Sequence, residues 1–152
     1  MKLKLRGGET GNKNAGIIAQ LWVWNSKDNL GKVFDSSTGF ILPNGANRSP
    51  DASWIPLTRW NALTDIEKQK FLPLCPDFAI ELLSPSDSLA KTQEKMKEYL
   101  DNGMALGWLI NNTQKQVEIY RSGKQVEVID APNSLSGENV LSGFVLDLQP
   151  IW

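Results

Sequence analysis

Two short apolar runs separated by a helix-like stretch constrain the fold of this chain more than any other feature. Phe78–Leu83 and Leu106–Ile110 each have the length of a buried strand. Between them, Ser88–Asn102 has the apolar spacing of an amphipathic helix, and Gly103 suits the position just after its end. A strand, a helix and a strand in succession predict two parallel strands joined by a right-handed crossover. The sequence therefore predicts an α/β fold.

Other stretches predict antiparallel strands around this unit. Gln116–Tyr120 and Gln125–Ile129 alternate apolar and polar residues on either side of a Ser-Gly turn, which is typical of a β-hairpin. Residues 7–14 are polar and rich in Gly, and we expect residues 1–12 to be mobile. The further predictions are helices over Ala15–Trp24 and Asp65–Phe71, the latter begun by Thr64, and strands over Gly31–Asp35, Phe40–Leu42, Asp51–Ile55 and Gly143–Leu148. Because 152 residues fit one domain, we predict a single domain with a mixed central sheet flanked by helices.

The residue types that are missing exclude several kinds of chemistry. The chain has no His and one Cys, Cys75. Ser-His-Asp triads, His-ligated zinc, internal disulfides and multi-thiolate sites are therefore excluded. Cys75 lies between Leu74 and Pro76, and we expect a small buried residue there. The chemistry that remains belongs to carboxylates, amines, hydroxyls and a hard metal ion with oxygen ligands.

The distribution of apolar residues along the chain indicates the cellular location to expect. No run of about 18 apolar residues is present, which argues against a membrane span. The first residues lack the apolar stretch of a secretory signal. We therefore expect a cytoplasmic protein.

Two carboxylates fall where the predicted strands would bring them together. Glu81 lies in the middle of a buried strand, where an unpaired charge is costly. Asp51 follows Pro50 at the start of another strand. If these strands are neighbours, the two side chains face each other about 5 Å apart and repel unless a cation or proton lies between them. Mg²⁺ or Mn²⁺ suits such a site, while a turn cap at Asp51 and a salt bridge at Glu81 are the alternatives.

A lysine on the following helix is a third candidate for the same site. Lys95 lies one turn from Tyr99 and borders the apolar stripe of this helix. From that position its amine can reach back toward the end of the Glu81 strand. The alternative is a side chain whose stem merely covers apolar surface.

Three segments in order carry a resemblance to a known family. They read Ser-Pro-Asp-Ala-Ser-Trp at 49–54, Cys-Pro-Asp-Phe-Ala-Ile-Glu-Leu-Leu-Ser-Pro-Ser-Asp at 75–87, and Lys-Met-Lys-Glu-Tyr-Leu at 95–100. Residues 107–110, 117–121, 135–138 and 140–144 add shorter matches. Together they resemble a bacterial family of putative restriction endonucleases within the PD-(D/E)XK nuclease superfamily. The resemblance covers the chain from residue 8 to the end.

The resemblance implies a restriction endonuclease-like core and Mg²⁺-dependent hydrolysis of DNA, with Mn²⁺ able to substitute. Asp51 and Glu81 match the acidic residues of the superfamily motif, and the backbone carbonyl of Leu82 would complete the metal ligands. The superfamily's lysine would fall two residues after Glu81, where this chain has Leu83. In this family the lysine stands on the next helix, and Lys95 matches that place. A homodimer would suit the cutting of both DNA strands.

The chain departs from its relatives in two places, which keeps other functions open. Many superfamily members have an acidic residue on the first helix, but Lys13–Ile17 contains none, and Asn111-Asn112 replaces a common Asp-Pro. With a pI of about 5.5, a basic DNA-binding strip must be local, and the residues that could form it are Lys91, Lys95 and Lys97, or Arg48 and Arg59. The alternatives are a non-catalytic nuclease-fold domain for binding or assembly, and a carboxylate-based glycosidase.

Overall fold

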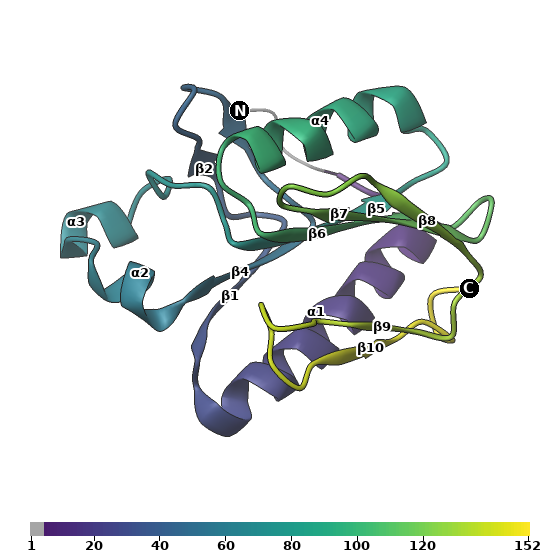
Figure 1. Ribbon diagram of the computed structural model, residues 1–152, viewed down its shortest axis with the longest axis horizontal. Coiled ribbons are helices and arrows are strands. Elements are labelled where there is room, and N and C mark those ends of the chain that lie inside the picture. Colours follow the sequence, from purple (N-terminus) through teal and green to yellow (C-terminus); the bar gives the residue numbers. More distant parts are fainter. Residues whose placement is uncertain (1–4) are drawn as a thin grey trace.

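The computed structural model describes residues 5–152 and builds them around a six-stranded mixed sheet (Figure 1). The strand order is β1-β4-β5-β6-β7-β8, in which β5 and β6 are parallel and the other neighbours are antiparallel. The strands are β1 (Gly31–Asp35), β2 (Phe40–Ile41), β3 (Asn47–Arg48), β4 (Ala52–Pro56), β5 (Phe78–Leu83), β6 (Leu106–Asn111), β7 (Gln116–Arg121), β8 (Glu127–Asp130), β9 (Ser134–Ser136) and β10 (Val145–Asp147). The helices are α1 (Gly8–Asp28), α2 (Leu57–Asn61), α3 (Asp65–Lys68) and α4 (Leu89–Asp101). The predicted α/β fold is confirmed.

The strand–helix–strand unit forms as the sequence predicts. β5 and β6 pair in parallel, with Phe78 level with Leu106. Ser88 caps α4, its hydroxyl accepting a hydrogen bond from the backbone N–H of Lys91. After the helix, Gly103 has a φ of 110°, a conformation that costs Gly little.

The first helix begins earlier than the sequence indicates. α1 starts at Gly8 rather than Ala15, so the prediction of a mobile lead-in is wrong for residues 8–12, while residues 1–4 lie outside the described part of the chain. Gly and Asn are poor helix formers, but tertiary contacts hold this end of the helix. Thr10 and Asn14 are buried, and the Asn14 side-chain amide donates to the backbone carbonyl of Asp51 at 3.2 Å.

Several short elements differ from their predictions. α3 is a single turn, although Thr64 caps it as expected and exchanges two hydrogen bonds with Glu67. The helix α2 and the strands β3 and β9 were not predicted. The strand predicted near the C-terminus is β10, which pairs with β9 outside the central sheet. The three elements that were not predicted are a helix of five residues and strands of two and three residues, and none of them shows a distinct periodic pattern in the sequence.

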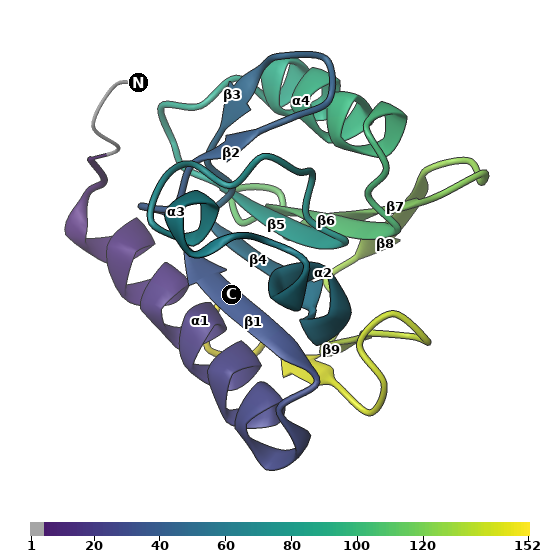
Figure 2. The same ribbon diagram turned by 90° about the vertical axis from the view of Figure 1, so that its left-hand side faces the viewer.

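Two layers cover the faces of the sheet. α4 lies over one face together with the β2–β3 hairpin, whereas α1 and the β9–β10 hairpin cover the other (Figures 1 and 2). Each layer encloses its own apolar core, and the main members are Phe40, Ile55, Met96, Tyr99 and Leu109 on the α4 side and Ile17, Leu21, Phe78, Ile80 and Trp108 on the α1 side. Within residues 5–152, none of the helices combines the length and the apolar character that crossing a membrane requires.

Candidate active site

Asp51, immediately before β4, and Glu81, on the adjacent strand β5, come together in the central sheet. In the β4–β5 pairing Ala52 is level with Ile80, so Asp51, one residue earlier, is level with Glu81, one residue later. Because strand side chains alternate, both carboxylates point to the α4 face. Asp51 is 0% exposed and Glu81 is 3% exposed. The conditional expectation that their strands are neighbours therefore holds, and both acids are buried.

The Glu81 carboxylate contacts two side chains of α4. The Tyr99 hydroxyl donates to Glu81 Oε2 at 2.8 Å, and the Lys95 amine lies 3.8 Å from Oε1. Burial, reinforced by the negative charge of Glu81 and by this hydrogen bond, holds the pKa of Tyr99 well above its ordinary value. Tyr99 therefore remains a protonated donor that orients Glu81. From sequence, Tyr99 was assigned only to the apolar stripe of its helix. Its spacing of four residues from Lys95 was the signal that both side chains reach one site.

The Asp51 carboxylate is held by the backbone of β5 and by an arginine from the start of the chain. Its Oδ2 accepts a hydrogen bond from the backbone N–H of Leu82 at 2.7 Å. The Arg6 guanidinium donates to Oδ1 through Nη2, and its Nη1 approaches the carbonyl oxygen of Leu82 at 3.4 Å. Sequence alone did not indicate Arg6, because residues 1–12 were predicted to be mobile and no periodic pattern links Arg6 to Asp51.

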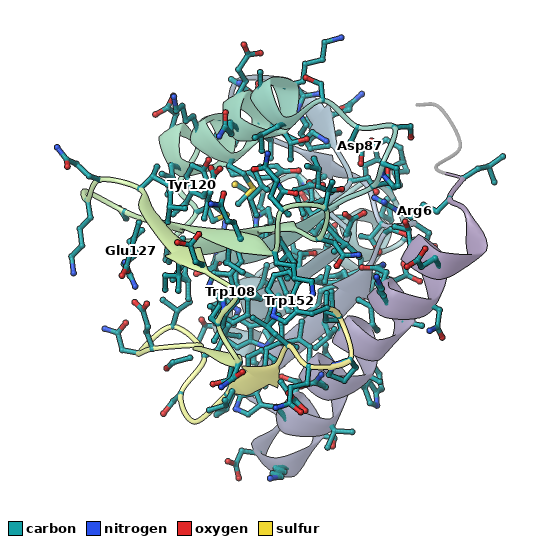
Figure 3. The ribbon with its side chains drawn as sticks, turned by 90° about the vertical axis from the view of Figure 1, so that its right-hand side faces the viewer. Arg6, Asp87, Trp108, Tyr120, Glu127 and Trp152 are labelled. Carbon is teal, nitrogen blue, oxygen red and sulfur yellow. The ribbon has the colours of Figure 1, made fainter. Side chains whose placement is uncertain are left out.

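A third carboxylate, Asp87, lies near the two cations of the site. Burial would raise the pKa of Asp87, but hydrogen bonds from Ser84 and the positive charges of Arg6 and Lys95 outweigh it and lower this pKa below its ordinary value. Figure 3 shows Asp87 and Arg6 on the same side of the molecule. Asp87 is exposed, in the turn between β5 and α4. In the sequence, Asp87 stands out only as the last residue of the 75–87 segment.

The oxygen atoms at this site suit a hard divalent ion. Asp51 and Glu81 supply two carboxylates, and the Leu82 carbonyl, already approached by a cation, adds a neutral oxygen. Mg²⁺ is commonly held by one or two carboxylates with water completing its shell. Within the described chain no group of three or more His, Cys, Asp or Glu side chains is arranged to hold a metal. The residues present therefore fit a two-carboxylate site, with the carbonyl and water as the other ligands.

Comparison with known proteins assigns the chain to a family. Residues 3–149 match the model of the Uma2 family, whose description is "Putative restriction endonuclease". The chain belongs to the Uma2 family. A solved structure described as a putative nuclease from Anabaena variabilis covers 99% of this chain and 84% of its own, with a TM-score of 0.83 and 20% sequence identity. At that identity the likeness shows the fold, and no curated protein matches.

The positions that differ from the superfamily motif can be located in the structure. Leu83, at the usual position of the superfamily's lysine, is buried. On the first helix, Glu9 is exposed and paired with Lys13 at 3.1 Å, whereas Asn14 contacts the backbone of Asp51. Asn14 Oδ1 is buried with no hydrogen-bond partner among residues 5–152. Asn14 thus brings a neutral oxygen, rather than a carboxylate, to this end of the sheet.

Cys75 matches its predicted role as a buried residue. It is 2% exposed, and its thiol lies 3.5 Å from the carbonyl oxygen of Tyr99. Burial raises the pKa of the Cys75 thiol to about 12. A thiol that stays protonated is a poor nucleophile, so the chemistry of the chain rests on its carboxylates and amines.

Proposed function

We propose that this chain is a metal-dependent DNA endonuclease that hydrolyses phosphodiester bonds. The family and the fold support a nuclease. The observation that carries the finer proposal is the pair of buried carboxylates, one just before β4 and one on β5, with a lysine and a backbone carbonyl beside them. In this proposal Asp51, Glu81 and the Leu82 carbonyl hold Mg²⁺, or Mn²⁺ in its place.

Each residue of the site has a distinct part in the proposed mechanism. When bound, the divalent ion lowers the pKa of a water molecule and offsets charge on the phosphate. Asp51 is fixed by the Leu82 N–H, and Glu81 is fixed by the Tyr99 hydroxyl, so both ligands are oriented in advance. Lys95, whose side chain is 34% exposed, can orient the attacking water or neutralise charge on the phosphate.

Substitution of the two acids tests this proposal. Asp51→Asn and Glu81→Gln keep the shape of each side chain and remove its charge, and each should reduce Mg²⁺-dependent nicking of a supercoiled plasmid by about a hundredfold or more. Glu118→Gln is the matched control. Glu118 is also buried on the α4 face, but it bonds to Gln93 and Tyr120, two strands away from Glu81. Cutting that survives in both site variants, or that fails equally in the control, contradicts the assignment.

DNA as the substrate and a homodimer as the active form are parts of the same proposal. Arg48 and Arg59 already form ion pairs with Glu98 and Asp77. The basic strip proposed for DNA is the lysine set of α4, in which Lys91 and Lys97 accompany Lys95, the lysine already beside Glu81. Sedimentation of the protein with and without a DNA duplex tests both parts.

A specific observation also favours a second candidate, a nuclease-fold domain without catalysis. Asp51 is paired with Arg6 and Glu81 with Lys95, so each acid has a cationic partner from the chain itself. In such a domain these pairs replace the metal permanently. Calorimetric titration with Mn²⁺ separates the two candidates, since only the nuclease should bind the ion through Asp51 and Glu81.

A further inference from the structure

We infer that Arg6 and the divalent ion compete for the same oxygen atoms, so that an arm formed by Leu5 and Arg6 acts as an intrinsic block of the metal site. This inference rests on the proposed function, because it concerns the regulation of the metal site proposed there. The Arg6 guanidinium contacts Asp51 Oδ1 and approaches the Leu82 carbonyl, which are two of the three proposed metal ligands. The side chain of Arg6 is 13% exposed, so the cation lies inside the site rather than at its rim.

Charge and geometry make the two occupants mutually exclusive. A guanidinium is a planar cation whose N–H groups fill the lone-pair directions of a carboxylate. A divalent ion needs the same lone pairs, and bringing it beside an arginine adds repulsion between like charges. Metal binding through Asp51 and Leu82 therefore requires Arg6 to leave.

The hydrogen bonding of Arg6 is incomplete, which favours a reversible block. Its contact with the Leu82 carbonyl, at 3.4 Å, is longer than a good N–H···O hydrogen bond. Its Nε is buried and has no hydrogen-bond partner within residues 5–152. A buried donor without a partner costs free energy. The blocked state is thus stabilised mainly by the contact with Asp51.

The backbone next to Arg6 is suited to moving the arm. Gly7 and Gly8 follow it directly, and among residues 5–152 nothing beyond the adjoining chain lies within 4 Å of the place where a Cβ would stand on either residue. Glycine reaches backbone conformations closed to other residues, so this pair can redirect the chain without steric cost. α1 begins at Gly8, and the carbonyl of its N-cap residue, Gly7, accepts a hydrogen bond from the Gly11 N–H at 3.0 Å, which ties Gly7 to the helix. The arm can therefore swing out while the helix stays on the sheet.

Metal affinity provides the first test. If Arg6 occupies the site in most molecules, only the remaining fraction can bind the metal, and the apparent affinity for Mn²⁺ falls in proportion to that fraction. Arg6→Met keeps the apolar stem and removes the charge and donors, so it should tighten Mn²⁺ binding in calorimetry by about tenfold or more. Arg59→Met is the matched control, because Arg59 likewise bonds a carboxylate, Asp77, and the backbone carbonyl of Cys75. The control should bind Mn²⁺ as the unchanged protein does.

A second readout separates displacement from a general effect of charge. Saturating Mn²⁺ should speed tryptic cleavage of the Arg6–Gly7 bond by at least about tenfold, measured by mass spectrometry, because the ion drives Arg6 out of the site. In Asp51→Asn the metal should leave this rate unchanged. This assay uses Arg6 itself and so does not depend on the folding of an Arg6 variant.

The outcomes distinguish failure of the inference from failure of the proposed function. Equal Mn²⁺ affinity in the unchanged protein and in Arg6→Met, with cleavage indifferent to metal, keeps the metal site and overturns the block. Tighter binding in Arg59→Met as well also overturns it. The absence of Mn²⁺ binding in every variant, including Arg6→Met, overturns the block and the proposed metal site together.

Discussion

The two faces of the central sheet differ in chemistry although the same strands build both. On β5, Phe78 and Ile80 pack into the apolar core under α1, whereas Glu81 points to α4. The buried polar residues of the strands and their ends on the α4 side include Asp51, Ser53, Glu81 and Glu118. Adjacent residues of one strand therefore have different roles, because their side chains point to opposite faces of the sheet. Both faces bury apolar side chains, and the α4 face also holds buried carboxylates in defined positions.

Partners make burial of these charges possible. Glu81 has Tyr99 and Lys95, and Glu118 has Gln93 and Tyr120. A buried carboxylate without such partners would lose its hydration uncompensated. The comparison teaches that carboxylates are buried on the α4 face, whereas the polar residues that α1 buries are the neutral Thr10, Asn14 and Asn25.

The largest effect on stability should come from the core under α1. Ile80 is 0% exposed, so Ile80→Ala loses buried surface and leaves a cavity, at an expected cost of about 2–5 kcal/mol in the free energy of unfolding. Urea denaturation measures this cost. Mn²⁺ binding by the folded fraction should be unchanged. A cost below about 1 kcal/mol would contradict the view that apolar burial in this core stabilises the fold.

Its sequence neighbour should behave in the opposite way. Glu81→Gln should change the free energy of unfolding by less than about 1 kcal/mol, because the amide still accepts from Tyr99 and the partly exposed Lys95 stays hydrated. The same change should weaken Mn²⁺ binding strongly in calorimetry. If Glu81→Gln destabilises as much as Ile80→Ala, Glu81 is a structural residue and the contrast between the faces fails.

Two tyrosines on the α4 face sharpen the comparison within that face. Tyr99→Phe and Tyr120→Phe each remove one hydroxyl that donates to a buried carboxylate, at 2.8 Å to Glu81 and 2.7 Å to Glu118. Each should cost about 1–2 kcal/mol in denaturation. Only Tyr99→Phe should also weaken Mn²⁺ binding, by a few fold. Equal effects of both variants on Mn²⁺ binding would show that Tyr99 has no specific part in orienting a ligand.

The smallest effect concerns pH. The pKa of Asp87 is lowered in the folded protein by hydrogen bonds from Ser84 and by the charges of Arg6 and Lys95, which outweigh burial. Its contribution to stability is therefore present above the ordinary Asp pKa of about 4 and is lost as pH falls through the lower folded value. In Asp87→Asn the free energy of unfolding should therefore fall slightly less steeply as the pH is lowered below about 4. An NMR titration of Asp87 should show its pKa rising in Arg6→Met.

Much of the fold follows from local patterns. The apolar runs of β5 and β6, the helix between them and the alternation of the β7–β8 hairpin each extend over at least four residues, so periodicity predicted them. The start of α1 was not predicted from local patterns, because the sequence of Gly8–Asn14 does not favour a helix by itself. Contacts such as Asn14 with the backbone of Asp51 hold it in place. Local propensity is easily overridden by such packing.

The sequence by itself determined the strand–helix–strand unit and the types of side chain available, which excluded imidazole and thiolate chemistry. It also indicated Asp51, Glu81 and Lys95 as members of one site. Only the tertiary structure decided that Arg6, 45 residues from Asp51, lies against its carboxylate, and that Tyr99 donates to Glu81. The physical reason is that periodicity reports which face a residue takes within its own element. Which distant side chain meets it there depends on how the elements pack.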